Sequence, residues 1–203
     1  ILNIHKRANP RIIGICTTGV TETKGDDVEG FLKNFRTKHP ELDELALVCV
    51  STPDFSGAFQ DGWAKCASAL IRTLTRPAAE RVENRVNVLA GAHLTVADIE
   101  EIRETIEAFG LEAVVLPDLS GSLDGHIPET FLPYTLGGTS IDAIANLGSA
   151  AFTIAIGPQM AETAALLGTR TGVPYTVFDR LTGLDASDRF VSCLAELSGR
   201  PVP

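Results

Sequence analysis

Short apolar runs rich in Val, Ile and Leu alternate with longer amphipathic stretches along most of this chain. Such runs are typical of strands that are covered on both faces of a parallel sheet, because neither face then meets water. The pattern predicts strands at residues 11–16, 45–50, 86–90, 111–116, 151–156 and 174–178.

The stretches between these runs predict helices at residues 27–38, 57–75, 95–109, 140–147 and 158–167. Helix-end signals support the third of them, since Thr95 and Asp98 have capping-box spacing and Gly110 follows the last turn. Strands that alternate with helices predict an α/β fold, with Rossmann-like, doubly wound parallel sheets and right-handed crossovers.

A charged segment at residues 76–85, which includes Pro77, separates the first two predicted strands from the four that follow. We expect a domain boundary there. Residues 1–80 would be the C-terminal part of a first α/β domain that is incomplete, and residues 84–203 would be a second, Rossmann-like domain. The chain starts at Ile1 without an initiator Met, so we expect a fragment of a longer protein.

The composition narrows the class of protein. With 44% hydrophobic residues, 21% charged residues and 4 Cys in 203 residues, the chain is neither disordered nor disulfide-stapled. The formal net charge of -9 argues against a nucleic-acid partner, because binding to phosphates needs clustered cations. The longest apolar runs fall short of the ~20 residues of a membrane span, so we expect no membrane partner.

The cysteines are too widely spaced for a metal motif or a dense disulfide framework, which favours a reducing, cytoplasmic compartment. Cys49 and Cys66 lie in apolar surroundings and are interpreted as small core residues. Cys16 ends a predicted strand and opens a polar loop that a cluster or partner could reach. One thiol does not hold an iron-sulfur centre alone, so no metal site is predicted.

Ligands bind beyond the carboxyl ends of strands in open α/β sheets, so the loops after the strands hold the candidate chemistry. The loop at residues 16–27 could present backbone N–H groups to an anion, or could be a polar loop with Asp26 as helix cap. It has neither of the glycine-rich phosphate motifs.

Two further loops follow strands. The loop at residues 51–63 contains the only Trp, Trp63, for which packing is the leading interpretation. The loop at residues 117–126 ends at His126, and His93 follows another strand. Both histidines are candidate site residues, with a structural role as the alternative.

Three loop sequences together resemble a known family. They read Cys-Thr-Thr-Gly-Val-Thr-Glu-Thr-Lys-Gly-Asp-Asp at 16–27, Ser-Thr-Pro-Asp-Phe-Ser-Gly at 51–57 with Asp-Gly-Trp at 61–63, and Leu-Pro-Asp-Leu-Ser-Gly-Ser-Leu-Asp-Gly at 116–125. In these loops the chain closely resembles the nitrogenase iron-molybdenum cofactor biosynthesis proteins of the NifN type, which are similar to the β subunit of the molybdenum-iron protein. The likeness continues through residues 183–184 and 198–201, so it covers nearly the whole chain.

The resemblance implies a noncatalytic scaffold, part of a chain with three Rossmann-like domains of the nitrogenase component 1 type. It would pair with the related E-type subunit in a heterotetramer, with a 4Fe-4S cluster at the interface and a precursor of the iron-molybdenum cofactor in the full complex. The nitrogenase iron protein would deliver molybdenum and homocitrate. No cofactor is expected in this chain alone, because the family's Cys ligand lies N-terminal to its first residue.

The resemblance also assigns site residues. In the catalytic β subunits a Cys that ligates the P-cluster stands where this chain has Gly19, so we expect no P-cluster ligand from this loop. The residues expected near the interfacial cluster are Thr17, Thr18, Gly19 and Glu22, and those expected to dock the iron protein are Asp26 and Asp27.

Two other readings stay open. The chain could be an electron-transferring oxidoreductase subunit, such as the nitrogenase molybdenum-iron protein β chain or the similar protochlorophyllide reductase chain, although Gly19 speaks against the first. It could also be a stand-alone α/β module that binds a small ligand at its strand-end loops. Because a truncated sheet has an unpaired edge, we further expect self-association through residues 11–50.

Overall fold

The computed structural model describes residues 1–121, 125, 127, 129–130 and 137–202, and it shows an α/β fold with two parallel sheets. The first sheet pairs β1 (Ile12–Cys16) with β2 (Ala46–Val50). The second has the order β4-β3-β5-β6, from β3 (Pro77–Leu89), β4 (Glu112–Leu116), β5 (Gly148–Ile156) and β6 (Tyr175–Phe178). Every strand pair is parallel, which confirms the predicted fold class.

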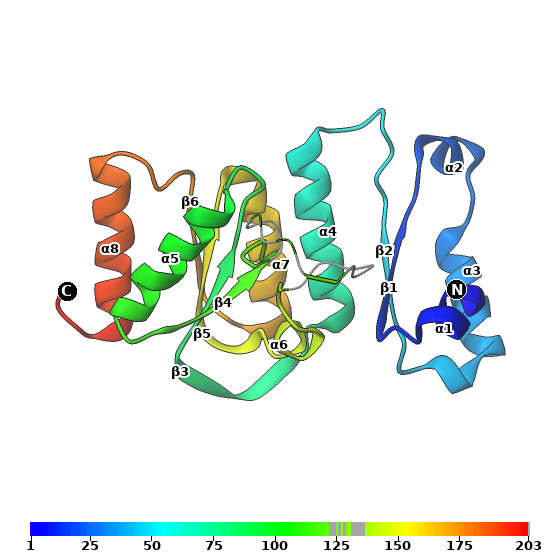
Figure 1. The fold of residues 1–203 in the computed structure, drawn as a ribbon, viewed down its shortest axis with the longest axis horizontal. Helices are drawn as coiled ribbons and strands as arrows, with labels where there is room; N and C mark the ends of the chain where they lie inside the picture. Colours follow the sequence, from blue (N-terminus) through cyan, green and yellow to red (C-terminus); the bar gives the residue numbers. More distant parts are fainter. Residues whose placement is uncertain (122–124, 126, 128, 131–136, 203) are drawn as a thin grey trace.

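The helices cover both faces of the second sheet (Figure 1). On one face, α5 (Val96–Ala108) and α8 (Leu184–Ser198) pack over the strands. On the other face lie α4 (Phe59–Leu74), α6 (Ile141–Ala145) and α7 (Ala161–Thr171), which follows a 3-10 turn at Pro158–Met160. This two-sided covering explains why the strands read as continuous apolar runs.

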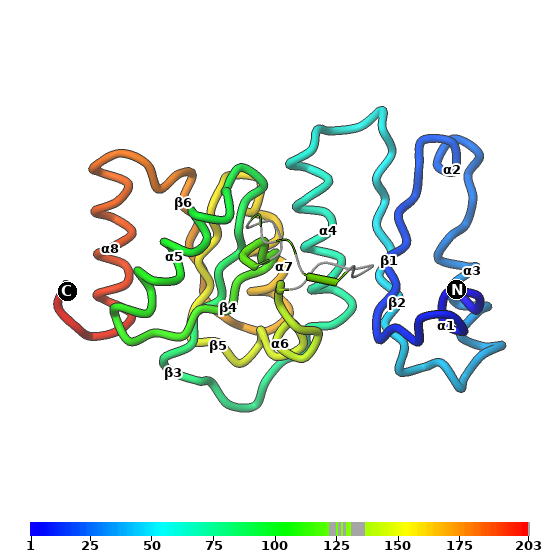
Figure 2. The backbone as a smooth tube through the Cα atoms, in the orientation of Figure 1, coloured from blue at the N-terminus to red at the C-terminus, as the bar shows by residue number. Residues whose placement is uncertain are grey.

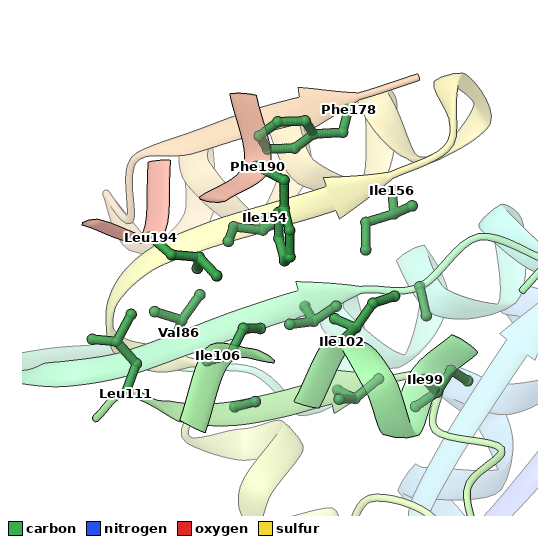
Figure 3. Close-up of a cluster of buried hydrophobic side chains, with 14 of the residues drawn as sticks. Val86, Ile99, Ile102, Ile106, Leu111, Ile154, Ile156, Phe178, Phe190 and Leu194 are labelled. Carbon is green, nitrogen blue, oxygen red and sulfur yellow. The ribbon is translucent and has the colours of Figure 1, made fainter. Parts of the chain in front are cut away.

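The larger core lies between the second sheet and the helices α5 and α8 (Figure 3). Ile106 of α5, Ile154 of β5 and Leu194 of α8 have no exposed surface there. Each such side chain stabilises the fold by roughly 1.5–3 kcal/mol relative to an exposed one. Phe178 and Phe190 meet edge-on in the same core, with ring centroids 5.7 Å apart.

Helix α4 lies between the two sheets (Figure 1). Its Ala67 and Ile71 are fully buried in the core of the second sheet. Its Ala69 packs instead with Val48 and Val50 of β2, in a separate cluster. One helix therefore couples both sheets.

The first sheet has a thinner cover. Its other face meets α1 (Leu2–Ala8), α3 (Val28–Lys38) and a 3-10 turn at Pro40–Leu42, while the short α2 (Gly19–Lys24) follows β1. None of the three α-helices contains a fully buried residue. With two strands in the described chain, this sheet has open edges, and self-association through residues 11–50 stays a prediction.

The prediction that the third strand begins at residue 86 is wrong, because β3 already begins at Pro77. The charged segment is an irregular extension of the strand, in which Pro77 pairs with Gly148 and Val82 with Ala150. The Arg81 guanidinium donates to the carbonyl oxygens of Gly148 at 2.5 Å and Thr171 at 2.7 Å, which holds the extension against β5 and α7. The division into residues 1–80 and 84–203 stays a prediction.

Helix ends explain further agreements and differences. The cap of α5 is as predicted, since the Thr95 side chain accepts from the Asp98 N–H. The N-cap of α3 is Asp27 and not Asp26, because the Asp27 carboxylate accepts from the Gly30 N–H at 2.8 Å. The pattern also did not predict α1, α2 or α8. The start of α8 has no side-chain cap and carries the exposed Leu184, so it lacks the usual signals.

Candidate functional site at the carboxyl edge of the first sheet

The connections that leave β1 and β2 lie at the same end of the first sheet (Figure 2). They are residues 17–18, which lead into α2, and residues 51–58, which lead into α4. The Thr17 N–H donates to the Val50 carbonyl at 3.0 Å and so extends the pairing of the two strands into these loops. The parallel register brings together loops that are more than thirty residues apart in sequence.

Glu22 joins the two loops through its side chain. Its Oε1 accepts from the Ser51 hydroxyl at 2.6 Å and from the Thr17 hydroxyl at 2.5 Å. These two hydrogen bonds hold the pKa of Glu22 below its usual value, because they favour the carboxylate. The Thr52 N–H and hydroxyl in turn bond the Thr17 hydroxyl and carbonyl. Of the predicted site residues, Thr17 and Glu22 are thus brought together as a positioning network.

Thr18 and Gly19 form the start of α2. The exposed Thr18 is the N-cap, and its N–H donates to the Thr21 hydroxyl at 2.9 Å. Gly19 faces the second loop, since a Cβ added to it would collide with the Asp54 carboxylate and lie 3.3 Å from Phe55 Cδ1. Asp54 was not among the predicted site residues. Its place beside Gly19 depends on the strand register, which the loop sequence does not reveal.

The rim of this edge is apolar and exposed. Val20, Phe55 and Phe59 expose 68%, 67% and 74% of their surface. Phe59 also packs on Trp63, whose indole N–H donates to the Ala90 carbonyl at 2.8 Å, so Trp63 has the packing role expected for it. The three residues lie on the segments that leave β1 and β2, and exposed apolar side chains that form a continuous patch are typical of surfaces that a partner covers.

Asp26 and Asp27 are both exposed on the stretch between α2 and α3, but they differ in their bonding. Asp27 is occupied as the cap of α3. The Asp26 carboxylate has no hydrogen-bond or ion-pair partner in the part of the chain that the structure describes. Of the two predicted docking residues, Asp26 therefore offers the more available charge.

The edge does not form a complete ligand set for a metal cluster. Within the described residues, no three His, Cys, Asp or Glu side chains gather closely enough to hold a metal ion. Cys16 is exposed at the end of β1, whereas burial raises the pKa of the Cys49 and Cys66 thiols and so keeps them protonated. Gly19 has no side chain to donate, and the Glu22 carboxylate already accepts two hydroxyl groups.

Three cavities adjoin the strand ends. The largest, of about 620 Å³, runs along α4 beside β2 and is lined by Ser51, Lys65, Ser68 and Glu162, among others. Two others, of about 390 and 500 Å³, share His93 at the carboxyl edge of the second sheet. His93 therefore lines two cavities at this edge, while His126 lies outside the described residues.

Asp118, in the third predicted loop, has a structural role. Its carboxylate accepts from Arg103 Nη2 at 2.8 Å, from the Ser120 N–H at 2.9 Å and from the Ser120 hydroxyl at 2.5 Å. The Asp118 side chain is thereby satisfied within the fold.

Comparisons with known proteins place this α/β fold in a family. The sequence matches the family described as nitrogenase component 1 type oxidoreductase over residues 1–203. The chain belongs to that family. A solved structure described as "Nitrogenase Cp1 at pH 6.5" superposes with a TM-score of 0.91 at 28% identity, covering 99% of this chain and 44% of the other.

Within the family, the chain is similar to curated relatives named "Nitrogenase iron-molybdenum cofactor biosynthesis protein NifN". The relative from Bradyrhizobium diazoefficiens is 56% identical over 206 residues, which cover all of this chain and 44% of the relative. The relative from Nostoc sp. is 44% identical over 203 residues, which cover 46% of the relative. The chain thus spans less than half the length of these relatives, and the predicted resemblance is confirmed.

No helix among the described residues is both long and apolar enough to cross a membrane.

Proposed function

We propose that this chain is part of a scaffold subunit on which the iron-molybdenum cofactor of nitrogenase is assembled. The observation that carries the proposal is that Gly19, which offers no ligand side chain, stands between the two site loops beside the Asp54 carboxylate. The family resemblance implies a cluster-ligating Cys at this position in the catalytic β subunits. The names of the relatives at 56% and 44% identity support the same reading. In this proposal the chain positions and encloses the maturing cofactor, and cluster ligation falls to other residues.

The scaffold would pair with the E-type subunit in a heterotetramer of two copies each. The exposed apolar rim of Val20, Phe55 and Phe59 supports a partner at this edge, since burial of such side chains is a main source of stability at interfaces. A 4Fe-4S cluster would lie at that interface, and a precursor of the iron-molybdenum cofactor would be held in the full complex. Thr17, Thr18, Gly19 and Glu22 would form the wall of this chain toward the cluster.

The nitrogenase iron protein would dock near α3, with Asp26 and Asp27 as acidic contacts. Asp26→Asn should weaken docking more than Asp27→Asn. The Asp27 carboxylate is already engaged as the cap of α3, so its charge is less available to a partner. Cofactor maturation by the full complex, followed against salt concentration, tests this point. Unchanged maturation in the double variant at raised salt would remove the docking role.

The first experiment for the scaffold reading is anaerobic purification of the chain with and without its E-type partner, followed by iron and acid-labile sulfide analysis. We expect no stoichiometric iron in the chain alone, and iron in the complex. Iron that is bound by the chain alone and lost in Cys16→Ala would contradict the proposal, because it would make Cys16 a ligand. The chain would work in the cytoplasm, where its free thiols stay reduced.

The alternative is an electron-transferring oxidoreductase subunit, which the family name includes. That reading would require cluster ligands from this edge or a P-cluster at the interface. Spectroscopy of the purified complex separates the two, since a P-cluster has more irons and a different reduced state than a 4Fe-4S cluster.

A further inference from the structure

The connections of the second sheet change direction between β3 and β5, which are neighbours in the order β4-β3-β5-β6. After β3 the chain enters α5 on one face of the sheet, and after β5 it enters α7 on the opposite face. The two loops therefore diverge. The crevice between such loops, at the carboxyl ends of the strands, is where open α/β sheets bind ligands.

Two glycines and a histidine form the floor of this crevice. A Cβ added to Gly91 would collide with the carbonyl oxygen of Ile156, a backbone atom, so the ends of β3 and β5 approach closely here. Gly157 has a φ of 100°, a conformation that favours glycine. The His93 ring lies over both glycines, since its Cε1 would be 2.8 Å from a Cβ at Gly91 and 3.1 Å from one at Gly157. His93 thus stands where the two loops diverge.

Two cavities, of about 390 and 500 Å³, share His93 and Arg180 as lining residues. The smaller cavity is lined mainly by polar side chains at the ends of β5 and β6, among them Gln159. The larger continues between α5 and α8, where Ile102 and Phe190 of the core provide an apolar wall. The pair of cavities therefore suits a ligand with a polar head and an apolar body.

The charged groups of the crevice have both signs. Arg180 and Asp179 are exposed and have no hydrogen bond or ion pair with any residue that the structure describes. Asp98 is engaged as the helix cap, because its carboxylate accepts from the Thr95 N–H at 2.7 Å and the Thr95 hydroxyl at 2.8 Å. Glu101 adds a further negative charge to the larger cavity. A ligand with both a carboxylate and an ammonium group matches this set better than a plain anion does.

We propose that this crevice binds an α-amino acid with an apolar side chain. Arg180 holds the carboxylate, because the planar fork of its N–H donors matches a carboxylate in two parallel bonds. Asp179 accepts from the ammonium group, and the side chain enters the larger cavity against Ile102 and Phe190. This ligand site is independent of the scaffold role proposed above.

Probe compounds that each lack one group test the three parts of the ligand. They are L-phenylalanine, hydrocinnamate without the ammonium group, phenethylamine without the carboxylate, and glycine without the apolar body. Their dissociation constants are measured from the amide signals of the purified chain in NMR spectra. We expect phenylalanine to bind about tenfold more tightly than the others and to shift signals of residues 91–94, 157–160 and 179–182. Phenylalanine that binds no more tightly than the other probes, or that shifts signals elsewhere, overturns the site.

Substitutions assign the two ends of the head group. Arg180→Met should weaken phenylalanine binding about tenfold and leave phenethylamine unaffected, because phenethylamine has no carboxylate. Asp179→Asn should weaken phenylalanine but not hydrocinnamate, which has no ammonium group. Arg72→Met and Asp188→Asn are the matched controls, since they make the same charge changes at exposed positions that do not line either cavity.

Both controls should leave every dissociation constant within about twofold of the unmodified chain. Equal weakening by Arg72→Met and Arg180→Met would contradict the proposal, because it would indicate a general effect of charge or a site in the cavity along α4. If Arg180→Met weakened phenethylamine as much as phenylalanine, the carboxylate contact of Arg180 would be wrong.

Discussion

The two sheets of this chain use the same βα units but reach different degrees of burial. In the second sheet, four strands lie between helices on both faces, and side chains such as Ile154 and Leu194 have no exposed surface. In the first, one face of two strands is covered by α1 and α3, which contain no buried residue, and Leu47 retains 9% exposure. The comparison teaches that stability resides in the second sheet, while the candidate site lies at the edge of the less stable one.

The sharpest way to break this comparison is a matched pair of core truncations. Ile154→Ala in the second sheet should lower the free energy of unfolding by about 2–5 kcal/mol, because it leaves a cavity in a closely packed core. Leu47→Ala in the first sheet should cost less, since its surroundings are less closed and can relax. Urea denaturation measures both, and equal losses would show that the two sheets are equally packed.

Substitution of Arg81 should cause the next largest loss of stability. Arg81→Met keeps the length of the side chain but removes the hydrogen bonds to the carbonyls of Gly148 and Thr171. We expect a loss of roughly 1–3 kcal/mol, and faster hydrogen exchange in residues 77–85, because bonds from a charged donor are lost. Arg180→Met is the matched control, since Arg180 has no hydrogen bond or ion pair in the described structure. A similar loss in both variants would contradict the anchoring role.

The lowered pKa of Glu22 should make the stability of the two site loops depend on pH. Since hydrogen bonds from Ser51 and Thr17 lower its pKa in the folded protein, its contribution to stability is present above the unfolded pKa of about 4.3. That contribution is lost as the pH falls through the lower folded pKa. In the wild type, protection of amides in the two site loops should therefore decrease as the pH falls through this lowered pKa of Glu22. Glu22→Gln should show the decreased protection already at neutral pH, with Asp26→Asn as the control that changes nothing.

The smallest expected effect is a gain in stability from a substitution at Gly62. Gly62 lies within α4, and a Cβ added there meets nothing within 4 Å. Gly62→Ala should therefore stabilise the protein by about 0.5–1 kcal/mol through helix propensity. The thermal midpoint measures it, and Gly14→Ala, with equal room but outside a helix, should gain less. A destabilised Gly62→Ala would show that the surface of α4 is not open at this position.

The strands were predictable where burial on both faces makes a run continuously apolar, as in β2 and β5. The first half of β3 was not, because its exposed residues include the charges of Arg81 and Glu83, which pair or face solvent beyond the sheet core. At the site, the loops could be located from the strand ends alone. The contact between Gly19 and Asp54 and the bonds of Glu22 could not, because they depend on which strands become neighbours.

Helix α4 has a consequence for anyone who wishes to divide or recombine this chain. Its buried residues Ala67 and Ile71 belong with the second sheet, although its position in the sequence precedes the charged segment. A crossover at residues 76–85 would separate the helix from the surface that it covers and leave an apolar face exposed on each product. A crossover in the loop between β2 and α4 would keep that surface intact, so a chimaera that exchanges the second sheet should carry α4 with it.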